Sequence, residues 1–300
     1  MVFFSLRYCV LCIVRMDEFL LLCRRFGQLD ELAQAGGGNI SIKLDGCLSI
    51  IKSSGIALSD VSCEKGYCIV NHQQVKESLS YEKEPNLKTM TIGSGTPSLE
   101  VYFHSFMKKY VVHLHPSTML PYLCGPCPDA IPYFKPGFEL SKEIYKRWND
   151  EPVVFLKNHG VIFTSDSLED LFTIAEQTYE RFRRPGYVPL HMLWKFQDEY
   201  PRQYIYKVSI AETGSYLPIL LKHNIRKLTP DIALFLYDSI LVEDGYVFIR
   251  GPSKQKCIEI LEVLRSYCEA VDDSKTSLTE METAAILHWP AEMRRKSMLP

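Results

Sequence analysis

Three histidines have the residue type and spacing of a metal site. His113 and His115 lie two apart in a short β-branched segment that ends at Pro116, which predicts a strand with both imidazoles on one face. His159 follows a second apolar segment, where a strand end meets a loop. A catalytic zinc takes three protein ligands and leaves one position open. Spacing alone leaves two interpretations open, a metal centre or separate histidines packed in the core.

A carboxylate, Glu100, precedes the histidine pair in the sequence. It falls in the first turn of a helix that we expect to run from Ser98, its N-cap, to about residue 108. A carboxylate there can ligate a metal or act as a general base beside one. The helix dipole alone also favours an acidic residue at this position, and from the residues alone this second interpretation is the stronger.

Two short loops offer backbone N–H and side-chain hydroxyl donors to an anion such as phosphate. Their sequences are Gly36-Gly37-Gly38-Asn39 and Ser53-Ser54-Gly55. Neither loop matches a P-loop or a dinucleotide-binding fingerprint, so each is a weak signal when taken alone.

The elements that must position these residues are a mixture of strands and helices. Apolar periodicity predicts, in chain order, a helix over 16–34, a hairpin over 39–51 that turns at Asp45-Gly46, strands at 110–115 and 152–157, and a helix over 168–182. Further along we expect a strand at 232–237, a hairpin over 240–249 and a helix over 254–271. The fold class is therefore α/β. We divide the chain into an unassigned apolar extension (1–15), a main domain (16–195) and a smaller α/β appendage of unknown role (196–300).

Composition and charge are those of an ordinary globular chain. The sequence has 34 basic and 36 acidic side chains, so nothing in its charge indicates a nucleic acid or membrane partner. The apolar segment 1–15 is too short to span a bilayer. We interpret the ten scattered cysteines as reduced thiols of a cytoplasmic protein. Cys124 and Cys127 have the spacing of a thioredoxin redox pair but lack its strand–helix context, so we do not expect a redox role.

Taken in chain order, five motifs over roughly residues 18–185 resemble the class II aldolase/adducin family. The likeness is strongest to the aldolase half of bifunctional rhamnulose-1-phosphate aldolase/dehydrogenase proteins. The motifs are Gly36-Gly37-Gly38-Asn39-Ile40-Ser41-Ile42-Lys43, Ile51-Lys52-Ser53-Ser54-Gly55, Pro97-Ser98-Leu99-Glu100 followed by His104, Val112-His113-Leu114-His115-Pro116 and Asn158-His159-Gly160.

The resemblance implies a three-layer α/β/α domain around a largely antiparallel sheet, and a homo-oligomer that is usually a tetramer. It implies Zn²⁺, or another divalent metal, held by His113, His115 and His159, with Glu100 as the acid/base. The implied activity is that of a lyase, which cleaves or forms a carbon–carbon bond in a phosphorylated ketose through a metal-stabilised enediolate. The residues implied to hold the sugar phosphate are Gly38, Asn39, Ser54, Gly55 and Ser98.

Two departures from the family pattern and two alternatives stay open. Leu99 stands where the family commonly has a second serine, and no motif singles out the catalytic tyrosine among 17. A sugar-phosphate epimerase or dehydratase would use the same metal site, although the epimerases resembled here generally carry aspartate in place of Glu100. A non-catalytic adducin-like interaction module is the other alternative, and the presence of all three histidines argues against it.

Overall fold

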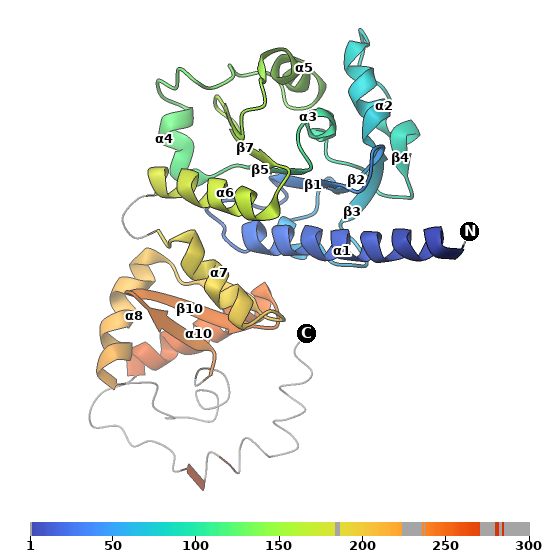
Figure 1. The fold of residues 1–300 in the computed structure, drawn as a ribbon. Coiled ribbons are helices and arrows are strands. Elements are labelled where there is room, and N and C mark those ends of the chain that lie inside the picture. The colour runs from blue at the N-terminus through green and yellow to red at the C-terminus, as the bar shows by residue number, and fades with distance from the viewer. Residues whose placement is uncertain are drawn as a thin grey trace. The chain divides into compact units, whose positions relative to one another are not determined.

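The computed structural model describes residues 2–183, 187–223, 236, 238–270, 280, 281 and 284. The chain divides into two compact units, Met1–Arg184 and Pro185–Pro300 (Figure 1). Except for Leu236, the strand expected at 232–237 lies outside the described residues. Within the described part of the chain, no helix has the length and apolar character needed to cross a membrane.

The first unit is built on a seven-stranded sheet in the order β4-β3-β2-β1-β5-β7-β6. All six neighbouring pairs of strands are antiparallel, which confirms the expectation of a largely antiparallel sheet. The strands are β1 (Asn39–Lys43), β2 (Leu48–Lys52), β3 (Tyr67–Asn71), β4 (Thr91–Ile92), β5 (Tyr110–Leu114), β6 (Val153–Leu156) and β7 (Gly160–Ser165).

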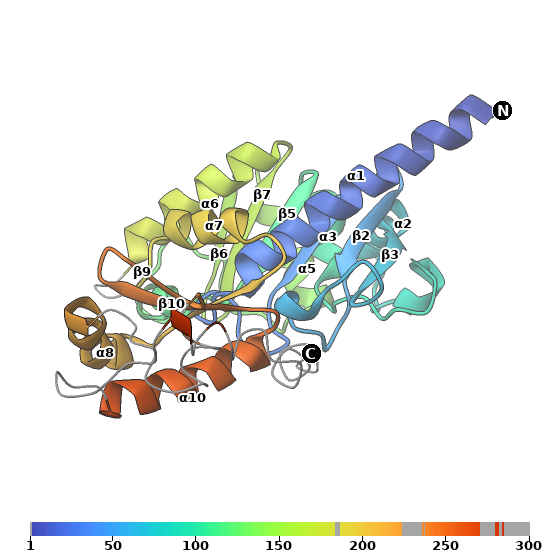
Figure 2. The same ribbon diagram turned by 90° about the horizontal axis from the view of Figure 1, so that it is seen from below.

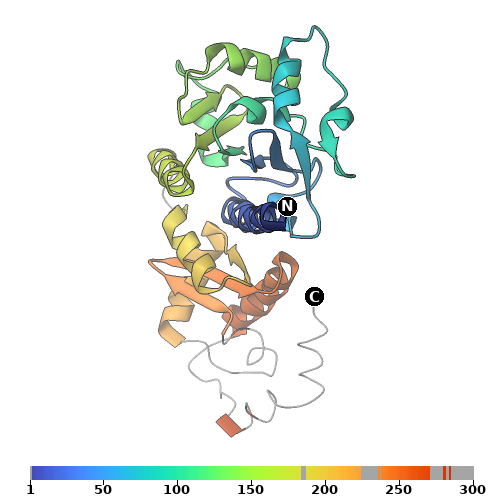
Figure 3. The ribbon, with the colours of Figure 1, turned by 45° about the vertical axis from the view of Figure 1, so that its right-hand side comes forward.

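Helices cover both faces of this sheet, as the expected three-layer fold requires. Helices α1 (Val2–Gly27) and α6 (Leu168–Phe182) lie side by side on one face, where the rings of Phe26 and Phe172 stack with centroids 6.0 Å apart (Figures 1 and 2). Figure 3 shows the other face covered by α2 (His72–Glu77), α3 (Val101–Phe106) and α5 (Phe138–Arg147). Shorter turns of helix are η1 (Leu58–Asp60), η2 (Ser78–Ser80), η3 (Leu87–Met90), η4 (Ser117–Met119) and α4 (Leu120–Leu123).

Two expected helices have boundaries that differ from the structure. Helix α1 begins at Val2, inside the unassigned extension, and ends at Gly27 instead of near residue 34. Gly27 packs so closely on η1 that an added Cβ would lie 2.5 Å from the backbone nitrogen of Ser59, and the chain turns there. Helix α3 begins at Val101, so its N-cap is Glu100 and not Ser98.

The second unit carries a three-stranded antiparallel sheet in the order β8-β10-β9. Its strands are β8 (Tyr204–Lys207), β9 (Ile240–Glu243) and β10 (Tyr246–Gly251), and its helices are α7 (Leu190–Glu199), α8 (Ile210–His223) and α10 (Lys254–Ala270). Phe248 packs on Phe196 of α7 with centroids 5.0 Å apart, whereas its neighbours Val247 and Ile249 belong to the core formed with α10. Helix α7 spans position 195, at which the sequence predicts the domain boundary.

Candidate metal and phosphate site

Four side chains that are distant in sequence converge at one point of the first unit. They are Glu100, His113, His115 and His159, and one ligand atom from each lies within 4.8 Å of the others. The Nε2 atoms of His113 and His115 are 3.0 Å apart. The two oxygens of Glu100 approach two different rings, with Oε2 3.3 Å from His113 Nε2 and Oε1 3.2 Å from His159 Nε2. The structure therefore brings together all three histidines and the carboxylate singled out from the sequence.

The sheet explains why these residues meet. His113 lies in β5 and His115 directly follows it, so their side chains face the same side of the sheet. His159 lies in the tight turn between β6 and β7, where Asn158 adopts a left-handed conformation with φ of 55°. Because β7 is the hydrogen-bonded neighbour of β5, this turn brings His159 beside the histidine pair. Ring centroids of His159 lie 4.9 Å and 5.0 Å from those of His113 and His115.

Gly160 makes room for the histidine rings. A Cβ at this position would lie 2.2 Å from the carbonyl oxygen of Leu114, 2.9 Å from Cδ2 of His115 and 3.0 Å from Cε1 of His113. The φ angle of Gly160 is not positive, so the requirement for glycine is one of space and not of backbone conformation. The glycine after His159 is therefore part of the site.

The hydrogen bonds and the burial of the histidines favour their neutral form. Nδ1 of His113 donates to the backbone carbonyl of Val161 at 3.0 Å, which leaves the Nε2 lone pair directed into the cluster. Burial, followed by the neighbouring His115, lowers the pKa of His113 well below its ordinary value. Burial, followed by His113, lowers the pKa of His159 to about 4. At neutral pH the rings are therefore unprotonated, as metal ligands must be.

The donor set fits a divalent cation such as Zn²⁺. Three imidazole nitrogens and one carboxylate are ligands that zinc prefers, and His113, His115 and His159 alone would leave a fourth position open. Oε1 of Glu100 and Nδ1 of His159 are buried without a hydrogen-bond partner in the structure. A buried carboxylate oxygen without a partner is costly unless a cation or a substrate group completes its environment.

The loops expected to bind phosphate lie together beside the histidines. A Cβ on Gly36 would lie 3.5 Å from the backbone of Gly55, and a Cβ on Gly37 would lie 3.0 Å from Nδ1 of His115. The backbone nitrogen of Ser54 donates to Thr96 at 2.8 Å, which connects the second loop to the segment that leads to Ser98. Two glycines of these loops, Gly38 and Gly55, have positive φ angles of 70° and 78°.

Two of the residues expected to bind phosphate contact Glu100 instead of facing open space. Asn39 is buried, and its amide nitrogen donates to Oε2 of Glu100 at 2.8 Å. Ser98 Oγ accepts from the backbone N–H of Glu100 at 3.3 Å. Ser54 and Gly55 are exposed; the backbone N–H of Ser54 is bonded to Thr96, so its hydroxyl group is the donor that this residue offers. Leu99, in the place of the family's second serine, is 60% exposed and offers no side-chain donor.

Lys52 is a residue of the site to which the sequence analysis assigned no role. It is almost completely buried, and its Nζ donates to the carbonyls of Gly36 at 3.0 Å, Ile56 at 2.6 Å and Ser53 at 3.3 Å. It thereby ties the two candidate phosphate loops together, and burial lowers its pKa. The available signal was a lysine at the end of an otherwise apolar strand, where a cation needs partners.

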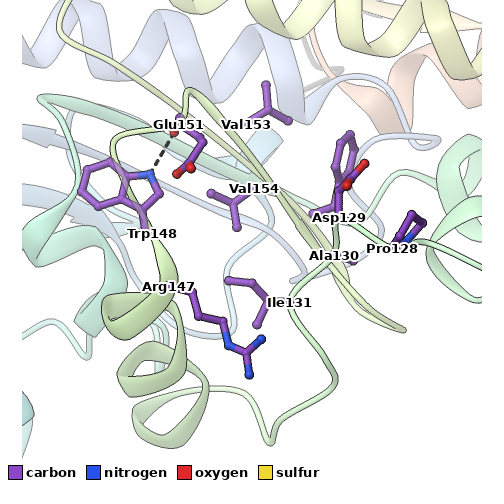
Figure 4. Close-up of a pocket in the computed structure, with 10 residues that line it drawn as sticks. Pro128, Asp129, Ala130, Ile131, Arg147, Trp148, Glu151, Val153 and Val154 are labelled. Atoms are coloured by element: carbon purple, nitrogen blue, oxygen red, sulfur yellow. Dashed lines mark hydrogen bonds between the residues drawn. The ribbon is translucent and has the colours of Figure 1, made fainter.

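A separate hollow of about 400 Å³ lies between the end of α5 and β6, and none of the residues expected in the site lines it (Figure 4). Its walls include Arg147, Val153 and the ring of Trp148, whose Nε1 donates to the carbonyl of Glu151 at 2.9 Å. The indole N–H is thus already occupied by the protein itself.

Comparison with known proteins finds relatives that match part of this chain. A curated relative, 3-oxo-tetronate 4-phosphate decarboxylase of Haemophilus influenzae, is 26% identical over 172 residues, covering 48% of this chain and 74% of the relative. A solved class II aldolase domain from Thermoplasma acidophilum is 22% identical with a TM-score of 0.48, over 53% of this chain and 87% of that one. A solved L-fuculose 1-phosphate aldolase is 19% identical with a TM-score of 0.43, over 62% and 96%. Residues 17–183 match the family described as Class II Aldolase and Adducin N-terminal domain, and the chain belongs to this class II aldolase/adducin family.

Proposed function

We propose that the chain is a metal-dependent lyase that cleaves or forms a carbon–carbon bond next to the carbonyl of a phosphorylated ketose. The observation that carries the proposal is the convergence of Glu100 with His113, His115 and His159. The three histidines would hold Zn²⁺ or a similar divalent cation. Such a cation supplies Lewis-acid chemistry, because it polarises the carbonyl and hydroxyl oxygens of a bound ketose.

Glu100 is the proposed acid/base of the reaction. In the cleavage direction the carboxylate of Glu100 would accept the proton of the substrate hydroxyl group. The carbon–carbon bond then breaks, an aldehyde leaves, and the electron pair forms an enediolate. The carboxyl group of Glu100 then returns a proton to the carbon next to the carbonyl, and in the condensation direction its carboxylate removes that proton. Its Oε1 suits this task, because it has no hydrogen-bond partner among the residues that the structure describes.

The anionic end of the substrate would bind at the adjoining loops. We assign the phosphate to donors of Gly38, Asn39, Ser54, Gly55 and Ser98, of which Asn39 and Ser98 also contact Glu100. Lys52 adds a buried positive charge next to this group of loops. We further propose that the protein works in the cytoplasm as a homo-oligomer of tetrameric type, with its site completed by a neighbouring subunit.

Decarboxylation of a phosphorylated 3-oxo acid is a second candidate reaction, favoured by the relative that carries this name. The two reactions share their central step, because in both a bond next to a carbonyl breaks and its electron pair enters an enolate. They differ in the group that leaves, which is an aldehyde in one case and carbon dioxide in the other. Glu100 would protonate the remaining carbon in both.

The test is turnover by the zinc-loaded protein of a panel of ketose 1-phosphates and of a 3-oxo acid phosphate, beside a Glu100→Gln variant. We expect wild-type protein to release dihydroxyacetone phosphate or carbon dioxide, and the variant to lose roughly 10²–10⁴-fold in kcat. If the zinc-loaded protein turns over neither class, the lyase proposal is wrong. Epimerised or dehydrated products would assign the same site to a different reaction, and an inert protein would favour the adducin-like module.

A further inference from the structure

A chain of buried polar side chains leads from Glu100 into the core of the first unit. The amide nitrogen of Asn39 donates to Oε2 of Glu100 at 2.8 Å, and the amide oxygen of Asn39 contacts Nε2 of His104. On the other side of the imidazole, Nδ1 of His104 lies 2.7 Å from Oγ of Ser41. Ser41, Asn39 and His104 are each no more than 3% exposed, so water does not compete for these bonds.

Which atom donates and which accepts in each of these hydrogen bonds follows from the groups at the two ends of the series. An ionised carboxylate only accepts hydrogen bonds, so Asn39 must turn its NH₂ group towards Glu100. The amide oxygen of Asn39 then faces His104 and needs a donor, which makes Nε2 the protonated nitrogen of a neutral ring. Nδ1 of His104 is consequently an acceptor, and Ser41 must donate its hydroxyl proton to it.

Burial keeps this ring neutral. His104 is 3% exposed, and burial, followed by the neighbouring His113, lowers its pKa well below the ordinary value. A protonated ring would present N–H to Ser41, whose hydroxyl group would then have to turn. The neutral form is therefore the one that matches the partners on both sides.

We propose that His104 and Asn39 are positioning residues that hold the carboxylate of Glu100 in one orientation. They fix Oε2 and leave Oε1 turned towards His159, 3.2 Å from its Nε2 and without a hydrogen bond among the described residues. The inference deepens the proposed lyase function and rests on it. His104 is the better residue to test. It reaches Glu100 only through Asn39, and it is not among the residues assigned to metal or substrate.

Two replacements of His104 separate positioning from simple packing. Glutamine can place an N–H group near the position of Nε2, so His104→Gln keeps the donor to Asn39. Asparagine is shorter and reaches only the position of Nδ1, so His104→Asn keeps the partner of Ser41 and leaves the amide of Asn39 free to turn. Both variants introduce a buried amide, which makes them matched controls for the loss of the ring itself.

Three readouts test the proposal. In metal-free wild-type protein, nitrogen NMR of the His104 ring should show a neutral imidazole protonated at Nε2. The absorption spectrum and dissociation constant of added Co²⁺ report on the orientation of Glu100. We expect His104→Asn to weaken Co²⁺ binding or lower kcat by about 10–100-fold with little change in KM, and His104→Gln to recover most of this loss.

The outcomes distinguish failure of this inference from failure of the proposed function. If wild-type protein binds Co²⁺ and turns over substrate but His104→Asn and His104→Gln behave alike, the positioning role is wrong and the proposed function stands. A wild-type His104 ring protonated at Nδ1 would overturn it without any variant. Wild-type protein that binds no Co²⁺ would instead overturn the proposed metal-dependent function.

Discussion

Replacement of Gly160 by alanine tests the packing on which the histidine cluster depends. The added Cβ would lie 2.2 Å from the carbonyl oxygen of Leu114, far inside normal contact distance. That carbonyl cannot simply withdraw, because Leu114 is paired with Val161 in the ladder between β5 and β7. The same Cβ would press on the rings of His113 and His115 at 3.0 Å and 2.9 Å.

The size of the effect follows from these contacts. Overpacking a close-packed region typically costs about 1–3 kcal/mol, and a clash with paired backbone belongs at the upper end, about 2–3 kcal/mol. For a unit of this size, that loss lowers the unfolding temperature by roughly 4–12 °C. The displaced rings should also bind metal less tightly.

Gly46→Ala is the matched control in the same unit. Its added Cβ would meet no atom within 4 Å, and its φ angle, like that of Gly160, is not positive. We therefore expect Gly46→Ala to leave stability unchanged or to raise it by up to about 1 kcal/mol. Scanning calorimetry of metal-free wild-type protein and both variants measures the difference. A Gly160→Ala protein as stable as Gly46→Ala would refute the packing argument.

Two further predictions concern other buried groups of the first unit. Lys52→Met should destabilise the protein by about 1–3 kcal/mol and weaken its binding of inorganic phosphate, since three backbone carbonyls lose their donor. Calorimetry and phosphate titration check this, and an unchanged phosphate affinity would show that Lys52 is not part of the anion site. Burial lowers the pKa of His72, so the unfolded chain takes up the proton first as pH falls below about 6.5. The free energy of unfolding should therefore decrease between about pH 7 and pH 5, and it should decrease less steeply in His72→Asn. Curves of unfolding free energy against pH that run parallel for the two proteins would contradict this.

Much of the site was predictable because its signals are local. The alternation of His113 and His115 in a strand fixes a shared face, and the motif around His159 places it at a strand end. The helix over 168–182 and the hairpin over 240–249 likewise follow from periodicity, and the structure contains both as α6 and the β9–β10 pair.

The features that were missed depend on contacts between distant segments. The end of α1 at Gly27 is decided by its packing on η1, which periodicity along the helix cannot show. Glu100 rather than Ser98 caps α3, and the preceding segment is held extended by the bridge between Ser53 and Pro97. The bond of Asn39 to Glu100 joins residues 61 apart, so no sequence pattern predicts that this amide serves the carboxylate.

The metal content of the purified protein tests the central claim most directly. Elemental analysis of wild-type protein should find about one zinc, or one similar divalent cation, per chain. A His113→Ala/His115→Ala variant should contain none, because it removes two of the three proposed ligands. Wild-type protein that is purified without metal, and that takes up no zinc when zinc is supplied, would contradict the account.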